Sequence, residues 1–211
     1  MSDDRAQPSS DPGPTADADY TERLVRLSSP LWKRVLPVQA PYRWNLRRLH
    51  LGRTLDVGCG VGRNLAFLDR TSVGVDHNVH SIEVARSKGL VAYSSEAFVA
   101  SADALSASFD TILLAHVVEH MDRETAVMII DGYRQYVKDG GRLVLITPQE
   151  AGFRSDATHV RFVDFDGLTD IADATGFEVE RAYSFPFPRA AGRKFTYNEF
   201  VMVARRGRRS L

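Results

Sequence analysis

A glycine-rich turn, set between an apolar stretch and a helix-like stretch, constrains the fold of this chain most. It reads Leu-Asp-Val-Gly-Cys-Gly-Val-Gly-Arg over residues 55–63, with glycines at 58, 60 and 62. Glycine lets the backbone turn sharply and lets a ligand approach it closely. A buried strand that runs into such a turn and then opens a helix is typical of α/β proteins that bind a nucleotide-like ligand.

Two acids and the glycine spacing indicate which ligand this turn suits. A dinucleotide site needs a third glycine three residues after the second, and Arg63 stands there. Asp56, two residues before the first glycine, would repel a pyrophosphate but suits an ammonium group. Asp76 ends the next strand-like stretch, where a carboxylate can accept hydrogen bonds from both hydroxyls of a ribose. The pattern disfavours a nicotinamide-dependent oxidoreductase and fits S-adenosylmethionine, which has a ribose, a cationic end and no phosphate.

Strand-like and helix-like stretches alternate along the chain, which predicts an α/β sandwich with a mainly parallel sheet. Strands are expected at 54–57, 72–75, 90–93, 109–115, 142–146, near 177–182 and near 199–204. Helices are expected at 62–69, at 79–87 with Asn78 as its cap, at 124–137 and near 166–174. The unbroken Ile-Leu-Leu at 112–114 is typical of a buried parallel strand.

The turn and three later segments resemble the motifs of class I S-adenosylmethionine-dependent methyltransferases. The acid and the G-x-G-x-G run are similar to the first motif of that family, and Asp76 is similar to the acid of its second. Residues 108–112, 116–120 and 139–143 resemble the entry to strand four, the "VLEH" segment behind it and the turn into strand five. The resemblance covers about residues 40–204. It implies a Rossmann-like, seven-stranded, mostly parallel sheet with an antiparallel last strand, flanked by helices.

The resemblance also implies which residues bind the cofactor. By it, the methionine end lies against Asp56, Gly58, Gly60 and Gly62, the ribose against Asp76 and His77, and the adenine against Ser95 and Glu96. Many members have an aspartate at the adenine position, and this chain has none there. Tyr42 and Arg43, upstream of the first strand, either close over the cofactor or serve ordinary helix packing.

Histidines and a glutamate follow the fourth predicted strand, at the expected reaction centre. His116, Glu119 and His120 form an H-x-x-E-H pattern, and in a helix these positions share one face. Two imidazoles and a carboxylate are plausible ligands for a divalent cation such as Mg²⁺. The segment resembles that of ubiquinone-pathway O-methyltransferases, which read E-x-x-E-H and hold a metal, although His116 replaces the first acid. In the alternative, Glu119 and His120 merely cap and orient the turn.

A second polar run lies beyond the fifth predicted strand and includes Asp156, His159 and Arg161. We expect it to overhang the methyl group, with His159 as base or ligand and Asp156 and Arg161 binding substrate. In the alternative, Asp156 and His159 bond to each other in a structured loop. The Thr-His-Val-Arg run resembles loops of bacterial methyltransferases found near sugar and polysaccharide genes, which favours a hydroxylated substrate.

These residues predict an S-adenosylmethionine-dependent O-methyltransferase with His116 and His159 near the acceptor hydroxyl. A sugar or saccharide hydroxyl is the first expected acceptor, with divalent-metal assistance, and a phenol or quinone precursor is the second. A non-catalytic, cofactor-binding accessory protein is the alternative from another class. Nucleic-acid amino-methyltransferases usually carry an Asn/Asp-Pro-Pro-aromatic run after strand four, and Ala-His-Val-Val at 115–118 stands there instead.

Composition sets the domain organisation and the expected location. The 27 basic and 27 acidic residues cancel, which argues weakly against a nucleic-acid partner. An acidic, disordered tail is expected over 1–19, a methyltransferase domain with an N-terminal helical lid over 20–204, and a basic tail over 205–211. One cysteine excludes an internal disulfide framework, and no apolar run is long enough to span a membrane. We expect a cytoplasmic bacterial protein. The sequence does not indicate its oligomeric state.

Overall fold

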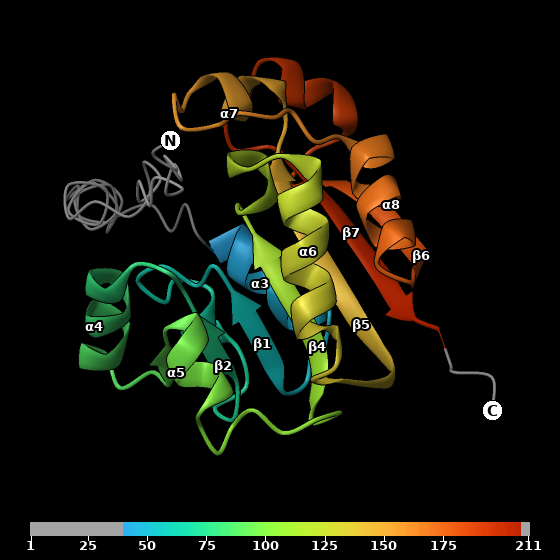
Figure 1. Ribbon diagram of the computed structural model, residues 1–211. Helices are drawn as coiled ribbons and strands as arrows, with labels where there is room; N and C mark the ends of the chain where they lie inside the picture. Colours follow the sequence, from blue (N-terminus) through green and yellow to red (C-terminus); the bar gives the residue numbers. More distant parts are fainter. Residues whose placement is uncertain (1–39, 208–211) are drawn as a thin grey trace, which may run out of the picture.

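Residues 40–207 are the part of the chain described by the computed structural model (Figure 1). The predicted acidic tail at 1–19, the predicted lid residues 20–39 and residues 208–211 of the predicted basic tail lie outside the described residues. The strands are β1 (Thr54–Val57), β2 (Val73–Val75), β3 (Ala92–Tyr93), β4 (Phe109–Ala115), β5 (Val137–Pro148), β6 (Phe177–Phe185) and β7 (Glu199–Arg206). The α-helices are α3 (Ala40–Arg48), α4 (Val79–Ser87), α5 (Ser95–Val99), α6 (Arg123–Arg134), α7 (Glu150–Arg154) and α8 (Phe165–Ala174). Three short 3₁₀ turns are η1 (Leu65–Phe67), η2 (Val118–His120) and η3 (Arg189–Arg193).

The seven strands form one sheet in the order β3-β2-β1-β4-β5-β7-β6. Strands β1 to β5 pair in parallel, whereas β7 runs antiparallel to both β5 and β6. The predicted Rossmann-like, mostly parallel sheet with an antiparallel last strand is therefore confirmed. All parallel strands end at one edge, which also receives the start of β7.

Helices cover both faces of the sheet, as Figure 1 shows for α6 and α8 on one face and α3 on the other. Successive side chains of a strand point to opposite faces, so a fully buried strand contributes to two cores. Ile112 and Leu114 of β4 join the core with α6 and α8, while Leu113 between them joins the core with α3. All three are at most 1% exposed, which confirms the predicted buried strand.

Several local predictions need correction. Residues 62–69 do not form an α-helix but a turn and the single 3₁₀ turn η1, because Gly62 has a φ of +78°, outside the right-handed helical region. Strand β5 begins at Val137, within the predicted helix 124–137, and its irregular first half includes Gly140 at a φ of +72°. The cap of α4 is as predicted, since the Asn78 side chain accepts a hydrogen bond from the Ser81 amide at 2.9 Å.

The final strand extends beyond its predicted end, into the expected basic tail. Arg205 and Arg206 belong to β7, and Arg205 pairs with Glu180. Arg206 is only 7% exposed, and its guanidinium donates to the carbonyl oxygens of Arg134 and Val137. Two of the four arginines assigned to the tail are therefore structural. Among the described residues, no helix is long and apolar enough to cross a membrane.

Candidate active site

The glycine turn lies at the carboxyl ends of the parallel strands, where ligands bind in open α/β sheets. The amides of Gly58 and Cys59 donate to the Val75 carbonyl at 2.8 and 3.1 Å, which ties the turn to the end of β2. Gly58 has a φ of +75°, and a Cβ atom there would lie 2.4 Å from Cγ2 of Val117. The turn is thus in close contact with the segment that follows β4, and only glycine fits it.

Asp56 is a buried acid below this turn. It is 1% exposed, and its Oδ2 has no hydrogen-bond partner among the described residues. Burial, together with the charge of Asp76, raises the pKa of Asp56 to about 7. A buried carboxylate with an unsatisfied oxygen is suited to bind a cationic group of a ligand.

Asp76 joins the end of β2 to the glycine turn. Its Oδ2 accepts a hydrogen bond from the Gly60 amide at 2.7 Å, and its Oδ1 accepts one from the Asn78 amide at 2.8 Å. Nδ1 of His77 lies 3.5 Å from Oδ1 of Asp76, with the His77 ring more than half exposed. Each carboxylate oxygen can accept more than one hydrogen bond, so hydroxyl groups could still bind there.

Ser95 and Glu96 begin α5, directly after β3. Oγ of Ser95 receives a hydrogen bond from the Tyr133 hydroxyl at 3.2 Å. The pKa of Glu96 is lowered by a hydrogen bond from its own amide and another from Ser94. Their place at the sheet edge is compatible with the predicted adenine contacts, which stay a prediction.

Tyr42 and Arg43 come from α3. The Tyr42 hydroxyl donates to the Tyr197 carbonyl, and the Arg43 guanidinium lies 4.3 Å from the centre of the Phe67 ring in η1. Burial raises the pKa of Tyr42, with a further contribution from Glu199. Both residues therefore have packing partners beside the site, and their contact with the cofactor stays a prediction.

The H-x-x-E-H segment is not the helix that its spacing suggested. Only residues 118–120 turn, as η2, and His116 precedes them with a φ of +59°, in the left-handed region. Nδ1 of His116 lies 3.3 Å from Oε1 of Glu119, and its Nε2 lies 2.9 Å from Oε1 of Glu199. Desolvation opposes protonation of this ring, but the two carboxylates outweigh it and raise the pKa of His116 to about 10.

Glu199 is a site residue that the sequence did not reveal. It is 83 residues from His116 along the chain and meets it because β7 pairs with the end of β5. The wholly buried Gln149 fixes this junction, since its side-chain amide donates to the Glu199 carbonyl at 2.9 Å. No motif marks Glu199, because only the antiparallel register places it at this edge.

The loop after α7 brings His159 to the turn after β4. The amides of Val160 and Arg161 both donate to the Glu119 carbonyl, at 2.9 and 3.1 Å. As a result, one potential ligand atom from each of Glu119, His120 and His159 lies within 4.8 Å of the other two. Burial lowers the pKa of His120, which favours its neutral form. The sequence had grouped Glu119 and His120 with His116, whereas this group contains His159.

The other two residues of that run, Asp156 and Arg161, interact with neighbouring parts of the protein. The Asp156 carboxylate accepts hydrogen bonds from the amide and the hydroxyl of Thr158, at 3.0 and 2.8 Å. The pKa of Asp170 in α8 is lowered mainly by hydrogen bonds from Arg123 and further by the charge of Arg161. Asp156 thus shapes the loop and Arg161 lies toward α8, and their roles in substrate binding stay predictions.

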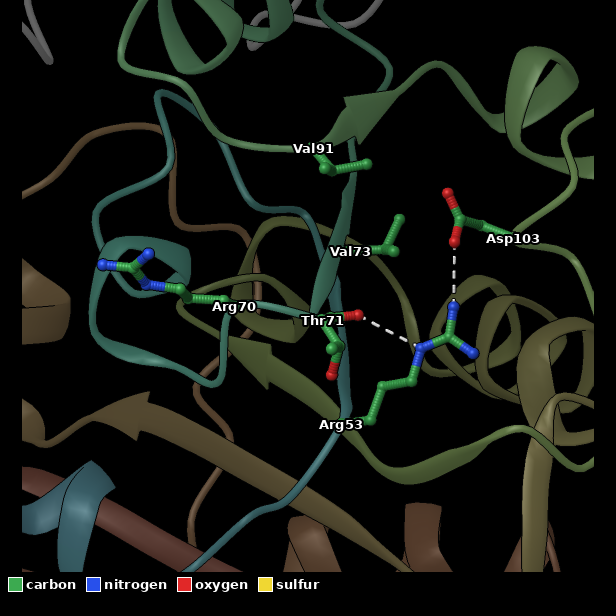
Figure 2. Close-up of a pocket in the computed structure, with 6 residues that line it drawn as sticks. All are labelled: Arg53, Arg70, Thr71, Val73, Val91 and Asp103. Atoms are coloured by element: carbon green, nitrogen blue, oxygen red, sulfur yellow. Dashed lines mark hydrogen bonds and ion pairs between the residues drawn. The ribbon is translucent and has the colours of Figure 1, made fainter.

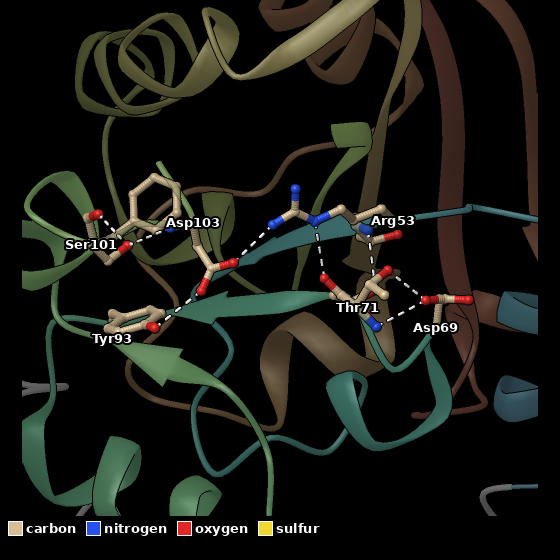
Figure 3. Close-up of polar contacts among 9 residues, drawn as sticks. Arg53, Asp69, Thr71, Tyr93, Ser101 and Asp103 are labelled. Carbon is tan, nitrogen blue, oxygen red and sulfur yellow. Dashed lines mark hydrogen bonds and ion pairs between the residues drawn. The ribbon is translucent and has the colours of Figure 1, made fainter. Parts of the chain in front are cut away.

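A separate depression of about 400 Å³ lies at the opposite edge of the sheet. Figure 2 shows its lining residues, Arg53, Arg70, Thr71, Val73, Val91 and Asp103. Figure 3 shows that Arg53 bonds to the Thr71 carbonyl and to Asp103, which also accepts a hydrogen bond from the Tyr93 hydroxyl. This network links the segments around β1, β2 and β3, far from the glycine turn, and we assign it a structural role.

Comparison with known proteins identifies the family. Residues 30–182, more than two thirds of the chain, match a family described as a methyltransferase domain. The chain belongs to the class I S-adenosylmethionine-dependent methyltransferases. No curated protein is similar enough in sequence to this methyltransferase to count as a match.

Solved structures share the fold of this methyltransferase at low sequence identity. A SAM-dependent methyltransferase from Archaeoglobus fulgidus is 20% identical with a TM-score of 0.62, covering 83% of this chain and 98% of its own. Magnesium protoporphyrin IX methyltransferase from Synechocystis, with bound S-adenosylhomocysteine, is 15% identical with a TM-score of 0.64, covering 92% and 97%. A putative methyltransferase from Bacillus halodurans is 16% identical with a TM-score of 0.57, covering 78% and 98%. The predicted family and fold are confirmed, and the methyltransferase uses S-adenosylmethionine rather than a nicotinamide cofactor.

Proposed function

We propose that this methyltransferase transfers a methyl group to a hydroxyl oxygen of a small acceptor. A sugar or saccharide hydroxyl is the first candidate, and a phenol or quinone precursor is the second. The observation that carries the proposal is the group of Glu119, His120 and His159. Glu119 and His120 directly follow Val117, which contacts Gly58 of the glycine turn. A hydroxyl oxygen must lose its proton at or near the transition state and benefits from such groups, whereas a carbon or amine nucleophile needs less help. We retain a cytoplasmic location and a small-molecule partner as part of this proposal.

The residues of the glycine turn fit the cofactor. The unsatisfied Oδ2 of Asp56 suits the ammonium group, and the carboxylate oxygens of Asp76 can each accept a further hydrogen bond from a ribose hydroxyl. When bound, S-adenosylmethionine supplies an electrophilic methyl group on a sulfonium. The glycine turn at 58–62 would then align that group with the acceptor, and alignment is the main contribution of the protein to an in-line displacement.

Proton transfer from the acceptor is the second task of the site. As the acceptor oxygen bonds to the methyl carbon, the carbon–sulfur bond breaks and the hydroxyl proton must leave. Nδ1 of His159 faces the Phe153 carbonyl at 2.8 Å and therefore carries the hydrogen, which leaves the Nε2 lone pair for a base or ligand role. His116 has a carboxylate at each ring nitrogen, so we assign it the positioning of Glu119 and Glu199 instead of the predicted base role.

In our proposal, residues of this site would also hold a divalent cation. The fit rests on Glu119, which is wholly buried, with neither carboxylate oxygen hydrogen-bonded among the described residues. Glu119 and His120 would hold the cation, which would increase the acidity of a hydroxyl bound to it.

Binding and turnover experiments test the proposal. Calorimetry should detect S-adenosylhomocysteine binding and no comparable heat with NAD. With S-adenosylmethionine and a panel of sugars, phenols, amines and carbon acids, S-adenosylhomocysteine should accumulate only with the hydroxyl acceptors. Turnover confined to amines or carbon acids would contradict O-methylation. Cofactor binding without turnover on any class would favour the accessory protein instead.

The affinity for S-adenosylhomocysteine should increase as the pH rises from 6 to 8. The pKa of Asp56 is about 7 in the free protein, and the ammonium group of the ligand binds the ionised carboxylate. Below pH 7 the carboxyl must first lose a proton, so Kd should weaken by up to about tenfold per pH unit. Calorimetry at each pH measures this, and Asp56→Asn should give a flat profile. An equal slope in the variant would assign the titration to another group.

A further inference from the structure

Glu119 is a buried acid with incomplete charge compensation. It is 0% exposed, and although Oε1 lies 3.3 Å from Nδ1 of His116, neither oxygen has a partner in hydrogen-bond geometry among the described residues. His116 also faces Glu199, so at most one positive charge serves two carboxylates. Burying an ionised carboxylate without full compensation is costly, and the local excess of negative charge favours a bound cation.

Two imidazoles lie beside this acid, and each has one ring nitrogen that can bind a metal. Nδ1 of His120 faces the Thr158 carbonyl at 3.1 Å, and Nδ1 of His159 faces the Phe153 carbonyl at 2.8 Å. A carbonyl oxygen can only accept, so both Nδ1 atoms carry the hydrogen and both Nε2 atoms carry a lone pair that can bind a metal. Histidines that bind metals almost always donate their other ring hydrogen to such an oxygen.

Backbone hydrogen bonds and ring contacts hold this group together. The Glu119 carbonyl accepts two amide hydrogen bonds from residues 160 and 161, which fixes the His159 loop against η2. The Phe153 ring stacks on His159 at 5.4 Å between ring centres, and the His120 and His159 rings lie 4.8 Å apart. The donor atoms are therefore held in place by the fold.

We propose that Glu119, His120 and His159 form a site for one divalent transition-metal ion of the Zn²⁺ type. Imidazole nitrogens suit Zn²⁺, Co²⁺ and Fe²⁺, whereas Mg²⁺ prefers oxygen ligands. This assignment replaces His116 with His159 in the predicted ligand set and replaces Mg²⁺ as the predicted ion. Three protein ligands leave a coordination position open, which is where the acceptor hydroxyl would bind. With His159 as a ligand instead of a base, the proton of that hydroxyl would pass to solvent water. The inference deepens the proposed function and rests on it only for the role of the ion.

Metal titration of the chelator-treated protein, without cofactor or acceptor, tests the site. Zn²⁺ and Co²⁺ should each bind at one equivalent per chain, measured by competition with a chromogenic chelator and by the visible absorption of Co²⁺. Mg²⁺ in large excess should not displace Co²⁺. His159→Ala and His120→Ala should each weaken Zn²⁺ binding by at least about 100-fold, the upper end of the loss caused by removing an outer-shell partner.

Control variants separate the site from folding and from the proposed function. His80→Ala removes an exposed histidine of α4 and should bind Zn²⁺ like the unaltered chain. Unchanged S-adenosylhomocysteine binding by His159→Ala would show that this variant is folded. Unchanged Zn²⁺ binding by the folded His159→Ala protein, or displacement of Co²⁺ by Mg²⁺, would overturn the assignment. Zn²⁺ binding without methylation of any hydroxyl would support the metal site and contradict the proposed function. Hydroxyl methylation by protein that binds no Zn²⁺ would support the proposed function and contradict the metal site.

Discussion

Asp56→Asn should weaken S-adenosylhomocysteine binding at pH 8 by at least about 100-fold, because it removes a buried, charge-assisted contact worth roughly 3 kcal/mol. The same change should stabilise the ligand-free protein. A carboxyl pKa raised from 3.8 to about 7 means that stability is lost as the pH rises through that interval, since the folded state must keep a proton that the unfolded state releases. The asparagine side chain does not ionise and so avoids this loss of unfolding free energy, which at pH 8 is as much as about 4 kcal/mol.

Calorimetry and chemical unfolding at pH 5 and pH 8 measure both effects. The stabilisation should be large at pH 8 and small at pH 5, where the carboxyl is protonated. Asp103→Asn is the matched control, because Asp103 pairs with Arg53 at the opposite edge of the sheet. That variant should leave S-adenosylhomocysteine binding unchanged. A destabilised Asp56→Asn protein that still binds tightly would show that this carboxylate is structural and does not contact the ligand.

Gly58→Ala should abolish measurable cofactor binding and lower stability. A left-handed backbone costs a non-glycine residue roughly 1–2 kcal/mol. The new methyl group would also lie 2.4 Å from Cγ2 of Val117, so the turn or the segment after β4 must move. Such a displacement would disturb the orientation of the cofactor, and a misplacement of about 1 Å can reduce the rate by about 100-fold.

Gly89→Ala provides the control for this second prediction. Gly89 also has a positive φ, +77°, but an added Cβ there meets no atom within 4 Å. It should therefore show the backbone cost alone, with cofactor binding intact. Adding Val117→Ala to Gly58→Ala should recover part of the binding by making room. Equal binding losses in the Gly58 and Gly89 variants would mean that contact with Val117 is unimportant.

Local chemistry explains why much of the fold was predictable from sequence. Alternating strand and helix patterns gave all seven strands, because unbroken apolar runs such as 112–114 must be buried on both faces of a sheet. The predicted helix at 62–69 was wrong because Gly62 has two roles in the glycine turn. Gly62 takes a left-handed conformation that opens the turn, and that conformation prevents a helix from starting there.

The sequence by itself determined the family, the glycine turn and the acids at 56 and 76. Each belongs to a short segment in which the residue types and their spacing indicate the ligand. Only the tertiary structure decided which histidines act together. Antiparallel pairing of β5 with β7 brings Glu199 to His116, and two amides from the His159 loop bond to the Glu119 carbonyl. These contacts join residues far apart in the chain, and no local pattern encodes a register or a loop position.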